Sequence, residues 1–183
     1  MGWTFYHCDN PNKIEEVRNL YTWQEDDRGA EVLDIAASGN IVYAAVHYWN
    51  NAANEDEVHA AVVKTATVSR DYFNFGYKDM SESMNPFYYD CPKRILDLLT
   101  PTTNEYALEW RRKCAEKRER TNALNRLKDG DRIVSCGKTL EKYTCVLRSG
   151  KRNTYFLIVE NGQPTFTYMR KSRIIDNGWE ESK

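Results

Sequence analysis

A single long helical segment, residues 104–128, most constrains the fold, because it separates two regions that both favour β-strands. Thr102 and Glu105 have the spacing of a capping box, and a helical pattern of apolar residues follows them. Before this segment, residues 31–37, 41–49 and 58–68 are rich in β-branched residues and are predicted to be antiparallel strands. After it, five short strands are predicted at 132–135, 143–147, 154–159, 165–169 and 173–175.

These patterns predict an α+β chain in three parts. Residues 1–103 form an N-terminal mixed domain with an antiparallel sheet, and residues 104–128 form a basic connector helix. Residues 129–183 form a small C-terminal β-barrel that resembles the SH3 or KOW type, because five short strands with Gly or Asn turns fit such a barrel.

The ends and the middle of the first domain carry further signals. Trp3–His7 is predicted to be a strand, followed by a helix that Asn10 caps and that has Pro11 at its first position. Residues 69–103 mix aromatic residues with Gly, Asn, Asp and Pro, so we expect irregular structure held by burial of the rings. Within it, residues 72–89 favour a core role, although aromatic residues also anchor interfaces. A short helix with Pro92 near its start should end this part.

Charge is divided unevenly along the chain. Residues 1–110 hold 8 Lys and Arg against 18 Asp and Glu, whereas residues 111–183 hold 18 against 9. Clustered charge positions and steers partners without specifying a fold. The helix and the barrel could form one phosphate-binding face, or their cations could simply solvate the helix and pair with the acidic domain. The predicted basic site comprises Arg111, Arg112, Lys113, Lys117, Arg118, Arg120, Lys151, Arg152, Arg170, Lys171 and Arg173.

The acidic domain offers a second candidate surface. Its carboxylates could imitate the phosphates of a nucleic acid and occupy a basic groove on a partner, or they could be an ordinary solvated surface. The predicted acidic partner face comprises Glu25, Asp26, Asp27, Glu55, Asp56 and Glu57.

Catalytic and cofactor chemistry have little support in the sequence. The five cysteines show no CxxC pair and no metal-type spacing with histidine, so we expect reduced thiols, no metal and no cofactor. Cys91 at a predicted helix start, or Cys8, could pair with His47 or His59 as a nucleophile, which leaves a Cys/His enzyme as an alternative. Nothing resembles a signal peptide or a membrane span, and we expect a cytoplasmic protein without a membrane partner.

Several stretches resemble a known protein family. Residues 70–80, 89–99 and 104–111, together with Trp3–Tyr6 and Leu127–Ile133, resemble a family of uncharacterised proteins from gut Firmicutes, their phages and their mobile elements. In size and over the whole sequence, the chain also resembles broad-acting anti-CRISPR inhibitors of the type II RNA-guided nuclease. That second resemblance implies a non-catalytic protein that binds the guide-loaded nuclease in the host bacterial cell and blocks DNA cleavage.

The expected function is therefore binding rather than catalysis. As an anti-CRISPR protein, the chain is expected to contact the nuclease with its acidic half and the guide RNA with its basic half. Such nucleases have basic channels and carry an acidic RNA. The alternative is a nucleic-acid-binding accessory protein of a phage or mobile element, which would bind DNA or RNA directly. The sequence does not indicate an oligomeric state.

Overall fold

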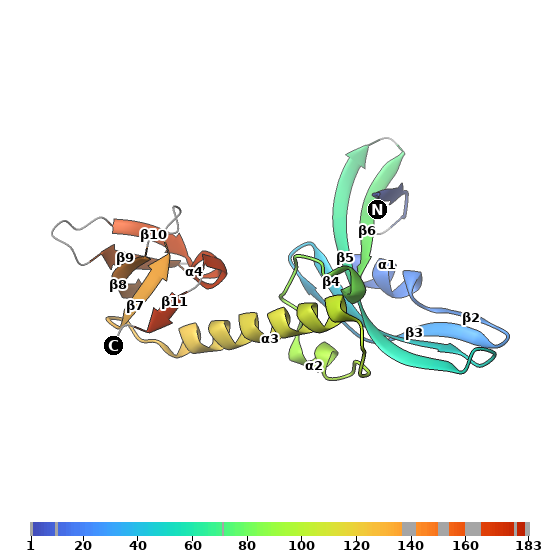
Figure 1. Ribbon diagram of the computed structural model, residues 1–183. Helices are drawn as coiled ribbons and strands as arrows, with labels where there is room; N and C mark the ends of the chain where they lie inside the picture. The colour runs from blue at the N-terminus through green and yellow to red at the C-terminus, as the bar shows by residue number, and fades with distance from the viewer. Residues whose placement is uncertain are drawn as a thin grey trace. The chain divides into compact units, whose positions relative to one another are not determined.

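The computed structural model describes residues 2–9, 11–70, 72–136, 142–149, 154–159, 166–177 and 179–181. It divides the chain into two compact units, Met1–Ala115 and Glu116–Lys183 (Figure 1). The predicted connector segment is a continuous helix, α3 (Glu105–Arg126), and the boundary between the units falls within it. Lys151 and Arg152 of the predicted basic site lie outside the described residues.

The first unit is built on a curled antiparallel sheet of six strands, which confirms the predicted α+β class. Its order is β1-β6-β5-β4-β3-β2. The strands are β1 (Thr4–Tyr6), β2 (Trp23–Glu25), β3 (Arg28–Ser38), β4 (Ile41–Asn50), β5 (Glu55–Arg70) and β6 (Phe73–Ser81). The strands predicted at 31–37 and 41–49 pair as an antiparallel hairpin, β3 and β4. Gly39 in its turn has a φ of +60°, which residues with a side chain rarely adopt.

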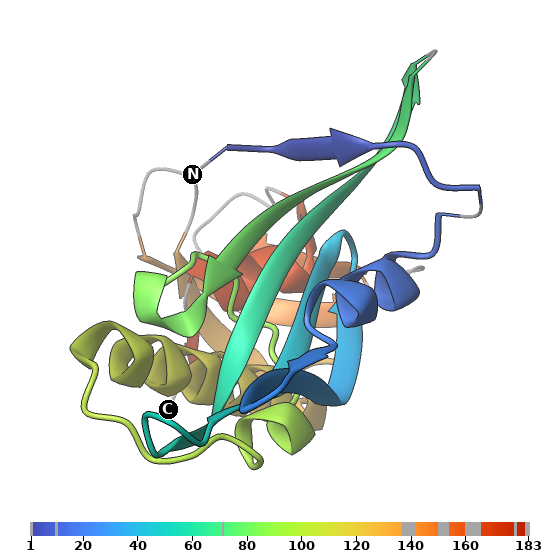
Figure 2. The ribbon, with the colours of Figure 1, turned by 90° about the vertical axis from the view of Figure 1, so that its right-hand side faces the viewer.

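Both faces of this sheet are covered, and strand β4 shows why. Tyr43 and Ala45 pack on one face against Trp110 and Cys114 of α3. Val42 packs on the opposite face against Val17 of α1 (Lys13–Leu20). Because side chains alternate along a strand, the continuous apolar run at 41–46 serves two cores at once. Figure 2 shows α1 on one side of the sheet and α3, with the short α2 (Lys93–Leu96), on the other.

Two helix starts differ from the prediction. Asn12, not Asn10, caps α1, because its side chain accepts a hydrogen bond from the N–H of Ile14. In α3, Asn104 takes the capping role expected of Thr102, since its Oδ1 accepts from the N–H of Ala107 at 3.0 Å.

The prediction of irregular structure at 69–103 is wrong for its first part. Residues 73–81 form β6, which pairs with β5 on one side and β1 on the other. Beyond β6, a 3₁₀ turn (Glu82–Met84) leads to α2. The aromatic rings divide between core and surface: Phe75 is buried, whereas Tyr72 and Phe87 are almost fully exposed.

The second unit holds a five-stranded antiparallel sheet of order β10-β9-β8-β7-β11. Its strands are β7 (Arg132–Cys136), β8 (Lys142–Ser149), β9 (Thr154–Val159), β10 (Phe166–Arg170) and β11 (Trp179–Glu181). The predicted last strand at 173–175 is wrong, because these residues lie in helix α4 (Lys171–Asn177). Ile174 and Ile175 are both buried against Leu124, Ile133 and Leu147. Two adjacent side chains of a helix can pack into the same core, whereas adjacent side chains of a strand point to opposite faces.

Candidate functional site

The two predicted acidic segments lie side by side at one end of the first sheet. Asp26 and Asp27 occupy the turn between β2 and β3, and the other segment opens β5. The N–H of Asn51 donates to the carbonyl of Asp27 at 2.8 Å, which joins the two hairpin turns. We call this surface the acidic end, and it consists of Glu25, Asp26, Asp27, Glu31, Glu55, Asp56 and Glu57, all of them exposed.

A histidine lies among these carboxylates. Nδ1 of His47 is 3.2 Å from Oε1 of Glu31, and its Nε2 is 3.1 Å from Oδ1 of Asp56. Partial burial lowers the pKa of His47, but the hydrogen bonds to Glu31 and Asp56 outweigh burial and raise this pKa above its usual value. Both ring nitrogens can donate only in the protonated form, so the two carboxylates favour the imidazolium.

Trp49 borders the same surface. Its ring lies 5.3 Å from the His47 ring, and it covers Gly29 on the neighbouring strand so closely that a Cβ there would lie 2.3 Å from the indole. Gly29 is therefore required by close approach of a ring, with no special backbone angle involved. The alternation of side chains along 47–49 could have placed His47 and Trp49 on one face, but nothing in the sequence linked them to Glu31.

The acidic end retains most of its charge. Its nearest cation is Arg28, which donates two hydrogen bonds to Glu25 at 2.8 and 2.5 Å. Seven carboxylates and one guanidinium give the acidic end a formal charge of −6, and protonation of His47 reduces it to −5. The surface can attract cations and hydrogen-bond to basic side chains.

The basic helix is different, because carboxylates of its own unit pair with several of its cations. Arg112 and Lys113 share Glu109 at 2.7 and 3.2 Å, and hydrogen bonds from Arg112 and then Lys113 lower the pKa of that carboxyl. Arg120 pairs with Glu116 at 3.8 Å. Lys117 and Arg118 are half-buried on the same helix. These ion pairs along the helix therefore neutralise part of the positive charge of α3.

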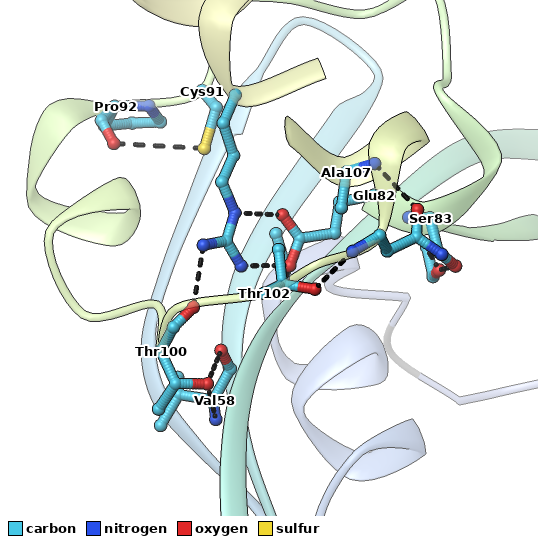
Figure 3. Close-up of polar contacts among 12 residues, drawn as sticks. Val58, Glu82, Ser83, Cys91, Pro92, Thr100, Thr102 and Ala107 are labelled. Carbon is cyan, nitrogen blue, oxygen red and sulfur yellow. Dashed lines mark hydrogen bonds and ion pairs between the residues drawn. The ribbon is translucent and has the colours of Figure 1, made fainter. Parts of the chain in front are cut away.

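Arg111 has a structural role, because it bonds to Glu82 and Thr100, both labelled in Figure 3. Its Nε and Nη2 donate to the two carboxylate oxygens of Glu82 at 2.6 and 2.7 Å, and its Nη1 donates to the carbonyl of Thr100 at 2.7 Å. Glu82 also accepts from the N–H of Ala60 at 3.2 Å, and its side chain is only 4% exposed. This bidentate pair holds the first half of α3 to the end of β6, and Arg111 contributes little to any phosphate-binding surface.

The remaining residues of the predicted basic site belong to the second unit. Arg170 ends β10 and Lys171 begins α4, and Arg173 is exposed on α4. Arg126 and Lys128 at the end of α3, and Arg132 at the start of β7, are also exposed. The structure therefore places several cations on the second unit, which holds 15 Lys and Arg against 9 Asp and Glu.

The candidate nucleophile Cys91 is buried, and the two candidate histidines lie on opposite faces of the sheet. Cys91 is 3% exposed, and its sulfur is 3.9 Å from the carbonyl of Pro92. His47 and His59 pair with Val58 and Val46 across β4 and β5, which places the two imidazoles on opposite faces of the sheet. Among the side chains that the structure describes, no group of three or more His, Cys, Asp or Glu could hold a metal ion. Over the same described residues, no helix is long and apolar enough to cross a membrane.

Comparison with known proteins adds one match. Residues 101–168 match a family model described as a domain of unknown function (DUF6927). This match covers α3 and most of the second unit and does not extend to the acidic end. Neither the curated proteins nor the solved structures contain a match.

Proposed function

We propose that this chain is a non-catalytic binding protein whose acidic end occupies a basic groove on a partner protein. The observation that carries the proposal is that two acidic segments, separated in sequence, lie side by side at one exposed end of the first sheet, where the formal charge is −6 with His47 neutral. Such a surface attracts a basic partner and accelerates its association. The cations of α3 support the opposite role less well, because Glu82, Glu109 and Glu116 pair with four of them.

The partner we propose is a type II RNA-guided nuclease loaded with its guide, inside a bacterial cell. The resemblance to anti-CRISPR inhibitors suggests this class of partner, and the charge of the acidic end suits it. These nucleases hold nucleic acid in positively charged channels, and carboxylates on a rigid sheet can occupy sites built for phosphates. Occupation of such a channel would exclude the target DNA and stop cleavage without any chemistry by the inhibitor.

The second unit is proposed to contact nucleic acid. Arg126, Lys128, Arg132 and Arg173 are exposed cations on α3, the segment after it, β7 and α4, and a small barrel of the SH3 or KOW type would present them from a rigid scaffold. In the nuclease complex this contact would reach the guide RNA. Without a nuclease it would make the chain a nucleic-acid-binding accessory protein of a phage or mobile element.

Co-purification with the guide-loaded nuclease, followed by a cleavage assay on target DNA, tests the proposal. The double variant Asp26→Lys and Glu55→Lys should weaken both association and inhibition by at least tenfold, because it changes the charge of the acidic end by +4. The matched control is Glu15→Lys with Glu119→Lys, which changes the charge equally at two exposed helix positions away from the acidic end.

Equal inhibition by wild type and the acidic-end variant would contradict the role of the acidic end. No association of the wild type with any guide-loaded nuclease would contradict the partner. In that case, binding of free RNA or DNA that weakens steeply with salt would support the accessory protein instead.

A further inference from the structure

The arm formed by β1, β6 and the second half of β5 carries an open aromatic groove. The groove has a volume of about 290 Å³, and Trp3, Phe5, Ala66, Val68 and Phe73 line it. Its three aromatic side chains are 40–42% exposed, which is unusual for three large rings that line one groove. Figures 1 and 2 show β5 and β6 extending beyond the helices, with β1 alongside them.

The Phe5 ring lies against Gly76 and beside two other rings. Phe5 pairs with Gly76, and a Cβ at Gly76 would lie 2.5 Å from the Phe5 ring, so this ring rests directly on the backbone of β6. Trp3 stacks beside Phe5 with centroids 5.8 Å apart and planes 15° apart, and Phe73 lies 6.4 Å from Phe5 on the other side. Ala66, opposite Gly76, and Val68 are small enough to leave space between the rings. Phe5 therefore lies against the backbone of β6 and is still 42% exposed.

Two lysines belong to the same face. Lys64 and Lys78 pair directly across β5 and β6, two positions from Ala66 and Gly76, and alternation places them on the Phe5 side of the sheet. The Nζ of Lys64 lies 5.9 Å from the Trp3 ring and 5.8 Å from the Tyr88 ring. Within the arm, this face of β5 and β6 carries Lys64 and Lys78, although the first unit as a whole is acidic.

We propose that this groove binds single-stranded nucleic acid, with bases stacked on Phe5 and Phe73 and phosphates beside Lys64 and Lys78. Flat rings on a sheet surface, small residues between them and neighbouring lysines are the elements of a stacking platform. An apolar peptide or a second copy would gain from the rings but would have to leave both ammonium groups beside apolar surface. Nucleic acid matches the rings and the charge together. This site is separate from the acidic end, and its existence does not depend on the proposed function.

The test is fluorescence anisotropy of the full chain with a labelled oligo(dT) of about ten nucleotides, a length suited to a short groove. Phe5→Ala and Phe73→Ala should each raise the Kd roughly 5- to 150-fold, the usual cost of losing one stacked base. Phe5→Trp keeps a flat ring and should bind like wild type. Phe87→Ala removes a ring that is 86% exposed and outside the groove, and it should leave the Kd unchanged.

Two further measurements separate this site from the cations of the second unit. Lys64→Gln with Lys78→Gln, which leaves the rings intact, should lower the slope of log Kd against log salt by about 1.4, about 0.7 for each phosphate contact on a single strand. Photocrosslinking of a bromouracil oligonucleotide should label peptides that contain Phe5 or Phe73.

An unchanged Kd for folded Phe5→Ala and Phe73→Ala, or crosslinks confined to residues 116–183, would overturn the proposal. A dimer that dissociates in Phe5→Ala, without oligonucleotide binding by the wild type, would also overturn it and identify a second copy as the occupant. Thermal melting of each variant establishes that it is folded.

Discussion

The acidic end and the aromatic arm lie at opposite ends of β5, and each places an aromatic ring over a glycine of the next strand. Trp49 covers Gly29 beside β5's first residues, and Phe5 covers Gly76 near its last. Trp49 is flanked by His47, which two carboxylates hold, whereas Phe5 is flanked by Trp3 and Phe73. The same packing arrangement therefore supports a charged surface at one end and a stacking surface at the other. The neighbours of the ring, more than the ring itself, determine what each end can bind.

The largest effect on stability is expected from a substitution between the acidic end and the aromatic arm, because it should destabilise the unit that carries both. Arg111→Ala should lower the free energy of unfolding of the first unit by about 3–5 kcal/mol, because it leaves the buried carboxylate of Glu82 without its ion-pair partner. Urea denaturation followed by circular dichroism measures the loss. Arg112→Ala, on the same helix with an exposed side chain, is the control and should cost far less. Equal losses for the two variants would contradict the structural role of Arg111.

A medium effect should distinguish the two glycines. Gly29→Ala should destabilise the chain by about 1–3 kcal/mol, because the added methyl group forces the half-buried Trp49 ring from its place. Gly76→Ala should change stability by less than about 1 kcal/mol, because the exposed Phe5 ring can swing outward and alanine is favoured over glycine in a strand. Displacement of Phe5 should nevertheless weaken oligonucleotide binding. Thermal denaturation and anisotropy of both variants test this, and a larger loss of stability at Gly76 would reverse the comparison.

The smallest effect is a dependence on pH at the acidic end alone. Since the folded pKa of His47 is raised, its stabilising contribution is fully present below about pH 6.5, the ordinary value for histidine, and is lost as pH rises through the folded pKa. The difference in unfolding free energy between wild type and His47→Gln should therefore shrink from pH 6 to pH 8. Glu31→Gln with Asp56→Asn should remove most of this dependence. A difference that grows with pH would show that His47 is stabilised in its neutral form.

A continuous apolar run rich in β-branched residues predicted the centre of the first sheet, but the alternation in β6 was overlooked. The run at 41–46 contains no turn-forming residues, and its strand was predicted correctly. Residues 73–81 also alternate, with Phe73, Phe75 and Tyr77 at every second position, but Asn74, Gly76 and Asp79 are turn formers and suggested irregular structure. Gly76 leaves space for the Phe5 ring of β1, and these two residues are far apart in sequence. No local pattern contains that information.

The candidate sites were predicted unequally for a related reason. The acidic segments were identified by composition, but their convergence depends on the pairing of two hairpins, and the role of His47 depends on three strands. The basic helix was also identified by composition, yet its ion pairs reduce its importance. Its partners Glu109 and Glu116 are three or four residues away and could have been predicted from helical spacing. Glu82, 29 residues before Arg111, could not.

Strand β5 changes neighbours along its length, and this makes the arm adjustable by insertion and deletion. Residues 55–64 pair with β4 and residues 61–70 pair with β6, so only four residues have both neighbours. Beyond residue 64 the arm can lengthen without altering the body of the sheet. Adding two residues to each of β5 and β6 would extend the arm by about 7 Å and keep every ring on its face, whereas adding one to each would turn the faces over. Related chains can therefore differ in the reach of this arm, in even steps, while they keep the same acidic end.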